Sequence, residues 1–121
     1  MNPIQQLGKQ GQDLAEKYLK TKGLKTLERN FRSRYGEIDL IMKDKNTLVF
    51  VEVKSRRSKG FGEPLESVTS QKQEKISFIA LHYLQLKKAL QKPARFDVIG
   101  IQMTEKPKIN WVKNAFDLQV F

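Results

Sequence analysis

The spacing of apolar residues predicts a helix near the N-terminal end of the chain. Between residues 4 and 22, apolar side chains recur at helical spacing, at Leu7, Leu14, Ala15, Tyr18 and Leu19. Gly23 follows as a stop signal. Gly8 and Gly11 are poor helix formers within this stretch, which indicates a late start or close packing of the helix against another element.

Three strands are predicted after this helix. Residues 24–32 form the first, with Leu24, Leu27 and Phe31 as apolar positions. The next two, at 36–43 and 47–54, are separated by the turn-type sequence Asp44-Lys45-Asn46. Two strands joined by such a short turn form a hairpin.

The second half of the chain begins with a predicted loop. Residues 55–68 contain three basic residues together with Gly60, Gly62 and Pro64, which indicates a mobile basic loop. A helix from about 70 to 91 follows, because Ser70 and Gln73 have the spacing of a capping box.

Two further strands are predicted, at 95–102 and 108–112. Asp97 stands at the start of the first, where an acid is usually structural, and Arg95 is the expected partner. The order α-β-β-β-α-β-β indicates a mixed α/β fold. We therefore expect one domain over residues 1–121, with a central mixed sheet of about five strands flanked by helices.

Charge favours a polyanionic partner. The chain has 23 lysines and arginines against 13 acids, a formal net charge of +10, which is typical of proteins that bind nucleic acid or anionic membranes. Neither predicted helix combines a basic face with bulky exposed aromatics, so a membrane partner is disfavoured. The sequence shows no signal peptide and no membrane-length apolar run, and we expect a cytoplasmic protein. The absence of cysteine excludes disulfides and thiolate metal sites.

The hairpin places two carboxylates opposite each other. If Lys45 and Asn46 form the turn, cross-strand partners have residue numbers that sum to 91. Asp39 is then opposite Glu52, and Glu37 is opposite Lys54. Directly opposed Cβ atoms are about 4.5–5.5 Å apart, so the two acids are forced together.

Facing carboxylates repel unless one is protonated, both are solvated, or a cation bridges them. Mg²⁺ and Mn²⁺ prefer such oxygen ligands. The other face of the hairpin carries only apolar residues, including Ile38, Leu40 and Met42, and is expected to be core. The alternative for the charged face is a solvated surface with a simple Glu37–Lys54 ion pair.

These motifs resemble a known family. GEIDLI at 36–41 and FVEVKSR at 50–56 give Asp39, a twelve-residue spacer, and then Glu52-Val53-Lys54. The pattern is similar to that of the YraN-like proteins, within the PD-(D/E)xK nuclease superfamily. The resemblance continues through four segments in the family's order: 8–19, 28–41, 68–76 and 95–101. It implies a restriction-endonuclease-like fold similar to archaeal Holliday-junction resolvases.

The resemblance also implies roles for individual residues. Asp39 and Glu52 would hold Mg²⁺ or Mn²⁺, and Lys54 would orient the attacking water or neutralise charge on the phosphate. Gln73 would lie near the site, although helix capping is an equal alternative. Glu37 would lie next to the metal ligands and help to position them without binding the metal, or else it would form an ion pair at the end of its strand.

One position departs from the family pattern. Related nucleases place a glutamate, a further metal ligand, in the first helix where this chain has Gln12. A glutamine offers a neutral oxygen without charge. Gln12 therefore stays a candidate beside the metal ligands, and it supports the alternative that the protein binds nucleic acid without efficient turnover.

Basic residues surround the hairpin in the sequence. They are expected to contact backbone phosphates, or else to be ordinary surface charges, and they comprise Arg32, Arg34, Arg56, Arg57, Lys59 and Lys72. The leading hypothesis is a metal-dependent endonuclease acting on DNA, favoured over RNA, and on branched or structured DNA in particular. The alternatives are a nucleic-acid-binding module with the same fold and a basic scaffold for a protein partner. A homodimer is compatible with either DNA-binding hypothesis.

Overall fold

The computed structural model describes residues 1–57 and 64–119. Its elements follow the predicted order, and in chain sequence they are α1 (Pro3–Thr21), β1 (Lys25–Ser33), β2 (Gly36–Asp44), β3 (Thr47–Arg56), the short 3₁₀ helix η1 (Pro64–Ser67), α2 (Ser70–Leu86), β4 (Ala94–Gln102) and β5 (Lys108–Phe116). The mixed α/β fold with a five-stranded mixed sheet flanked by helices is thereby confirmed.

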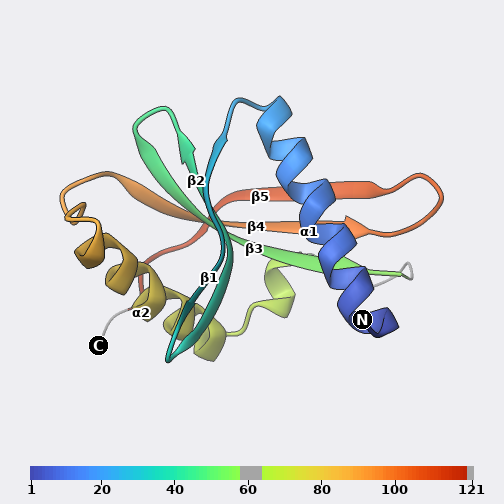
Figure 1. Ribbon diagram of the computed structural model, residues 1–121, viewed down its shortest axis with the longest axis horizontal. Helices are drawn as coiled ribbons and strands as arrows, with labels where there is room; N and C mark the ends of the chain where they lie inside the picture. Colours follow the sequence, from blue (N-terminus) through green and yellow to red (C-terminus); the bar gives the residue numbers. More distant parts are fainter. Residues whose placement is uncertain (58–63, 120–121) are drawn as a thin grey trace.

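The five strands lie in the sheet in the same order as in the sequence. β3 and β4 pair in parallel, while the other neighbouring strands pair antiparallel. A parallel pair needs a crossover connection, and α2 lies within the segment that joins β3 to β4. Figure 1 shows α1 and α2 on either side of a strongly twisted sheet.

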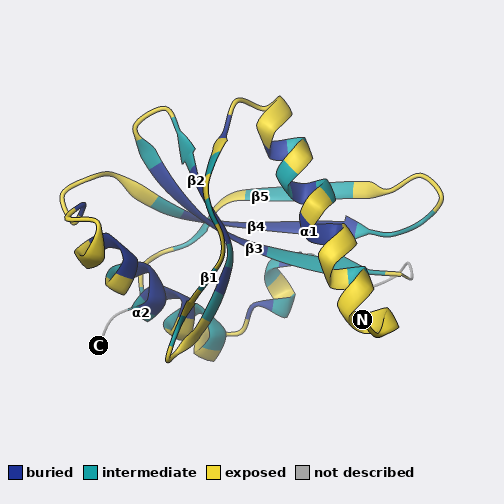
Figure 2. Ribbon diagram, viewed as in Figure 1, coloured by how far each residue is buried: buried dark blue, intermediate teal, exposed yellow. Residues whose placement is uncertain are grey.

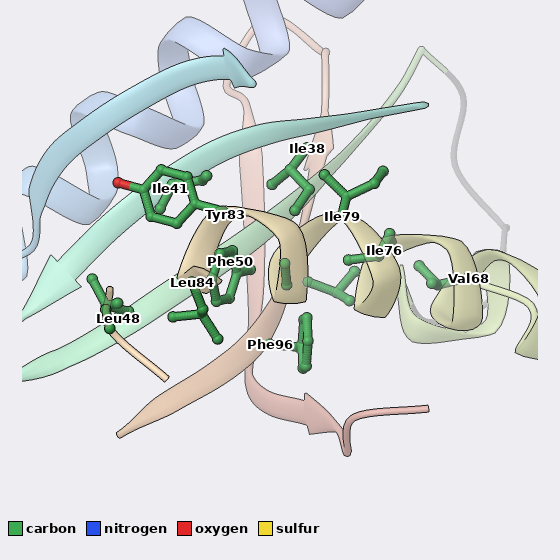
Figure 3. Close-up of a cluster of buried hydrophobic side chains, with 13 residues drawn as sticks. Ile38, Ile41, Leu48, Phe50, Val68, Ile76, Ile79, Tyr83, Leu84 and Phe96 are labelled. Atoms are coloured by element: carbon green, nitrogen blue, oxygen red, sulfur yellow. The ribbon is translucent and has the colours of Figure 1, made fainter. Parts of the chain in front are cut away.

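Two apolar clusters hold the helices to the sheet. The cluster beneath α2 contains Phe50 and Phe96 from neighbouring strands together with Ile79 and Tyr83 of the helix (Figure 3). The cluster beneath α1 contains Ala15 and Leu19 with Leu40, Met42 and Val51, among others. β3 and β4 lie between the two clusters, which explains why they are the most buried strands in Figure 2.

Both helices begin and end at positions set by local hydrogen bonds. Asn2 caps α1 in a capping box with Gln5. The predicted cap of α2 was wrong by one residue: Thr69, not Ser70, accepts the Lys72 backbone N–H. α2 ends at Leu86 rather than near 91, and Lys88 adopts a left-handed φ of 54° that cannot continue a helix.

β3 extends two residues beyond its predicted end. Ser55 and Arg56 pair with Ile101 and Gln102 of β4, and this parallel partner keeps them in the sheet. The predicted loop at 55–68 therefore starts later than expected, and Pro64–Ser67 form a 3₁₀ turn within it. Residues 58–63 of that loop, including Lys59, lie outside the described residues.

β2 changes faces at Asp39. Leu40 and Met42 belong to the cluster beneath α1, as their alternation requires. Ile38 should share that face, but it packs beneath α2 with Ile79 and Ile41 (Figure 3). The prediction of one continuous apolar face through Ile38, Leu40 and Met42 was therefore wrong: pairing of β2 with β3 ends at Leu40, and Ile38 packs with the cluster beneath α2.

α1 touches β3 closely at Gly11. A Cβ atom added there would lie 1.6 Å from Ser55 Oγ and 2.8 Å from Ser55 Cβ. The expectation that a helix glycine marks close packing against another element holds at this position. Gly11 thus fixes how near α1 approaches the end of β3.

Candidate active site

The candidate site forms where β2 and β3 separate. Five pairs, from Asp44↔Thr47 to Leu40↔Val51, follow the predicted register. One residue further, the Asp39 side chain takes the place of a backbone partner: its Oδ2 accepts the Val53 N–H at 2.8 Å. The carboxylate therefore lies against β3 at the point where the ladder between the two strands ends.

Asp39 and Glu52 form a crowded pair of acids. Glu52 is only 8% exposed. Burial, followed by a hydrogen bond and the negative charge of Glu52, raises the pKa of Asp39 to about 9. At neutral pH the pair therefore holds a proton between two carboxylates, which is how a protein carries such a pair when no cation lies between them.

Two lysines complete the site: Lys54 comes from β3 and Lys72 comes from α2. Lys72 Nζ, near the start of α2, lies 3.3 Å from Glu52 Oε2. Burial and the adjacent Lys72 lower the pKa of Lys54. Burial opposes charge on Lys72 as well, but contact with Lys54 and the charge of Glu52 raise its pKa overall. Of the two amines, Lys54 therefore loses its proton more readily than Lys72.

Glu37 does not face Lys54 as the register predicted. Beyond Leu40, β2 leaves β3 and stays paired with β1, where Glu37 is opposite Arg32. Its Oε1 accepts a hydrogen bond from Asn30 Nδ2, and its Oε2 lies 3.6 Å from Arg32 Nε. After burial and Glu52, the charge of Glu37 also contributes to the raised pKa of Asp39.

Asn30 is a site residue that the sequence did not indicate. Its side chain exchanges two hydrogen bonds with Gln12, at 2.9 and 3.1 Å, and donates to Glu37. Its φ of 53° is unusual within a strand. Gln12 is buried, and this amide pair fixes its position. Because Asn30 also donates to Glu37, hydrogen bonds connect Gln12 to Glu37. An asparagine in a strand sequence was the only signal, and it is a weak one.

Gln73 lies in the first turn of α2. Its Nε2 donates to the Val68 carbonyl at 3.0 Å. It therefore neither forms a capping box with Ser70 nor is directed by that bond toward the carboxylates. Lys72, which the sequence placed on a solvated helix surface or on phosphate, instead pairs with Glu52.

The other predicted phosphate contacts lie around the site in different settings. Arg32 is 80% exposed and pairs weakly with Glu37. Arg34 is exposed in the turn between β1 and β2. Arg56 is the last residue of β3, and the exposed Arg57 follows it. Lys59 lies outside the described residues.

A second buried acid, Asp97, is arranged differently. It has no solvent exposure. It accepts hydrogen bonds from Arg95 Nε at 3.0 Å, Trp111 Nε1 at 2.9 Å and the Asn114 backbone N–H at 2.9 Å. Arg95 also pairs with Asp44 at 3.0 Å. The predicted structural role of Asp97 with Arg95 is confirmed by these contacts.

Two properties bear on possible ligands. Among residues 1–57 and 64–119, no three histidine or acidic side chains converge to hold a metal ion, so that part of the chain offers two carboxylate ligands to a cation at the acid pair. In the same part of the chain, no helix is long and apolar enough to cross a membrane.

Comparison with known proteins identifies relatives along almost the whole chain. A family model described as "Uncharacterised protein family UPF0102" matches residues 11–101. A UPF0102 protein from Thermodesulfovibrio yellowstonii is 50% identical over 111 residues, covering 92% of this chain and 96% of that protein. Another from Desulfosudis oleivorans is 45% identical over 117 residues, covering 97% and 94%.

Among solved structures, Pyrococcus furiosus SfsA in complex with Ca²⁺ is similar to this chain at a low level. The alignment covers 91% of this chain and 63% of that one, with 15% identity and a TM-score of 0.41. A similarity this low says nothing of activity or ligands.

Proposed function

The chain belongs to the UPF0102 family, and we propose that it is a divalent-metal-dependent endonuclease that hydrolyses DNA phosphodiesters, with branched or structured DNA as the preferred substrate. The observation that carries the proposal is the pair of crowded acids, Asp39 and Glu52, beside two lysines of opposite pKa shift. The motif Asp39…Glu52-Val53-Lys54 supports it through its resemblance to the PD-(D/E)xK nucleases.

The acid pair fits a hard divalent cation. Mg²⁺ is commonly bound through one or two carboxylates and keeps several waters, and the site offers two carboxylates from this chain. Burial and the neighbouring Glu52 raise the pKa of Asp39, so a positive charge placed beside Asp39 would be favoured. A cation would supply that charge in place of the shared proton.

When bound, Mg²⁺ or Mn²⁺ polarises the phosphate and lowers the pKa of a ligated water. Asp39 and Glu52 would hold the ion, and the Val53 N–H would fix the orientation of Asp39. Lys54, whose pKa is lowered by burial and by Lys72, would be suited to orient the water. Lys72, whose pKa is raised overall, would be suited to neutralise charge on the phosphate.

Cleavage of a branched DNA in Mn²⁺ tests this proposal. Wild type should cut, while Glu52→Ala should lose about 10³-fold or more in rate, because it removes a ligand worth several kcal/mol of charge stabilisation. Glu105→Ala, an exposed acid in the β4–β5 connection, is the matched control and should cut as wild type does. Equal activity in the wild-type and Glu52→Ala proteins would identify a contaminating nuclease and refute the proposal.

Binding is tested separately through salt dependence. Replacing Arg56, Arg57 and Lys59 together with Ala should weaken affinity for all DNA sequences. The slope of log affinity against log salt should fall by roughly 0.7–0.9 for each phosphate that the variant no longer neutralises. An unchanged slope would show that these residues do not contact the DNA backbone.

The second candidate function is a nucleic-acid-binding module with the same fold. The observation that favours it is the Gln12–Asn30 amide pair, which occupies the position where the resemblance implies a further carboxylate ligand. Wild type that binds branched DNA but does not cut it above the Glu52→Ala background would support this alternative.

A further inference from the structure

Four residues form an aromatic and cationic surface beside the candidate active site. Arg34 and Tyr35, in the turn between β1 and β2, lie against Phe78 and His82 of α2, and we call this set the turn platform. The Tyr35 and Phe78 rings are stacked, with centroids 5.8 Å apart and an interplanar angle of 29°. The Arg34 guanidinium lies 5.1 Å from the centre of the Tyr35 ring and donates to its hydroxyl at 3.0 Å.

The platform is open to solvent. Tyr35 is 47% exposed although it is a large aromatic residue, and Arg34 and His82 are exposed as well. An open cleft runs between the turn and the helix, and Ser33, Leu81 and Gln85 complete its lining. Exposed aromatics beside a flexible cation and small polar groups are the combination that binds unpaired nucleotides, because bases stack on aromatic rings and on guanidinium planes.

The charge of the cleft favours a polyanion. Within the described part of the chain, the residues that line the cleft include the cation Arg34 and no acidic residue. Arg32, two residues away on β1, is 80% exposed. A single strand of nucleic acid supplies both a base for the rings and a phosphate for the guanidinium, and a duplex supplies no unstacked base.

We propose that the turn platform binds an unstacked base of a single-stranded segment, so that the preferred substrate has unpaired nucleotides next to the scissile phosphate. This inference rests on the proposed nuclease function and specifies its substrate. Tyr35 and Phe78 provide the stacking surface. Arg34 either stacks on the base or moves to the adjacent phosphate.

Two independent elements set the distance from the platform to the acid pair. Tyr35, in the turn just before β2, and Asp39 are four residues apart, about 13 Å if that stretch is extended. Along α2, Lys72 and Phe78 are six residues apart, about 9 Å along the helix. Both spans place the platform on the order of 10 Å from the acid pair along the chain. We therefore expect the bound base to lie within a few nucleotides of the cleaved phosphate.

The test measures binding without cleavage, in EDTA. The probes are an oligonucleotide single strand with 2-aminopurine, the same sequence as a duplex, and a duplex with a short unpaired flap that carries the 2-aminopurine. Wild type should quench 2-aminopurine fluorescence on the single strand and the flap. Tyr35→Leu should bind them about 5- to 150-fold more weakly, the value of one stacked base, while its affinity for duplex changes less than about twofold.

Two further variants make the result specific. Leu86→Ala changes an exposed residue at the end of α2 that does not line the cleft, and it should bind all three probes as wild type does. Arg34→Ala should weaken single-strand binding and reduce its salt slope by roughly 0.7. Thermal midpoints should be within the spread of the control for every variant, because Tyr35 and Arg34 are exposed.

Contrary outcomes separate this inference from the proposed function. Equal losses on single strand and duplex, or no loss with Tyr35→Leu, would overturn the platform even if wild type cuts DNA. Displacement of the single strand by an acidic peptide of equal affinity would indicate a protein partner and would also overturn it. Preferential single-strand binding through Tyr35 without any cleavage in Mn²⁺ would support the platform and refute the nuclease.

Discussion

Two buried acidic centres in this protein differ in whether their charges are satisfied. Asp97 is fully buried, yet an arginine, an indole and a backbone N–H all donate to it. Asp39 receives one backbone N–H, and burial together with the neighbouring Glu52 carboxylate raises its pKa to about 9. Burial of an acid is therefore a poor sign of function. An acid whose surroundings leave it short of positive charge is a better one.

The largest expected effect is a loss of stability on substitution of Asp97, which distinguishes this structural centre from the candidate site. Asp97→Asn removes the charge that balances Arg95, and one of its two oxygens becomes an amide that cannot accept a hydrogen bond. We expect a loss of about 3 kcal/mol in the free energy of unfolding, the usual effect of breaking a buried ion pair. Urea denaturation would measure it. A stability equal to that of wild type would mean that Asp97 is not the structural centre described above.

A smaller effect is expected where α1 meets the site. Gln12→Glu removes the N–H that donates to Asn30 and adds a charge near Glu37. We expect about 1 kcal/mol of destabilisation from the missing hydrogen bond, together with tighter Mn²⁺ binding because hard cations prefer anionic oxygen ligands. Calorimetric titration with Mn²⁺ measures the second effect.

The control for this variant is Gln12→Ala, which loses the same hydrogen bond without adding charge. It should be destabilised by a similar amount and should bind Mn²⁺ no better than wild type. If Gln12→Glu also binds Mn²⁺ no better, then Gln12 is too far from the acid pair to supply a ligand, and the Asn30 pair is structural.

The smallest effect at neutral pH is expected for Asp39→Asn. Asparagine keeps an oxygen for the Val53 N–H and is neutral without taking up a proton on folding, so stability should be unchanged or rise by a few tenths to about 1 kcal/mol. Asp97→Asn makes the same chemical change, so the two variants compare the centres without a difference in side-chain size.

The same variant has a pH signature. Because folding raises the pKa of Asp39 from 3.8 to about 9, the folded state binds a proton that the unfolded state releases. This contribution is fully present below about pH 4 and is lost as pH rises through about 9. In EDTA, the thermal midpoint of wild type should fall across that range relative to Asp39→Asn. Parallel pH profiles for the two proteins would show that Asp39 titrates normally.

Much of the fold followed from local patterns. The hairpin register was correct from Asp44↔Thr47 to Leu40↔Val51, because a short turn fixes the pairing next to it. The element order was correct because the apolar periods of helices and strands differ. Helix ends were less accurate, since Thr69 rather than Ser70 supplied the cap and Lys88 adopted a left-handed φ.

The site itself was only partly predictable. Alternation placed Asp39, Glu52 and Lys54 together, but it could not show that β2 and β3 separate after Leu40, because a side chain replaces a backbone acceptor there. That separation moves Glu37 away from Lys54 and toward Asn30 and Arg32. The contact of Lys72 with Glu52 and the role of Asn30 both depend on tertiary packing, which no local spacing encodes.

The close approach of Gly11 to Ser55 has an evolutionary consequence. The space between the two residues is filled by the Ser55 side chain and has no room for a Cβ atom on residue 11. Any larger residue at position 11 must push α1, and Gln12 with it, away from the strand that carries Glu52 and Lys54. A larger residue at position 11 should therefore appear among descendants of this sequence only together with a glycine at position 55, and growth at position 11 alone should be eliminated.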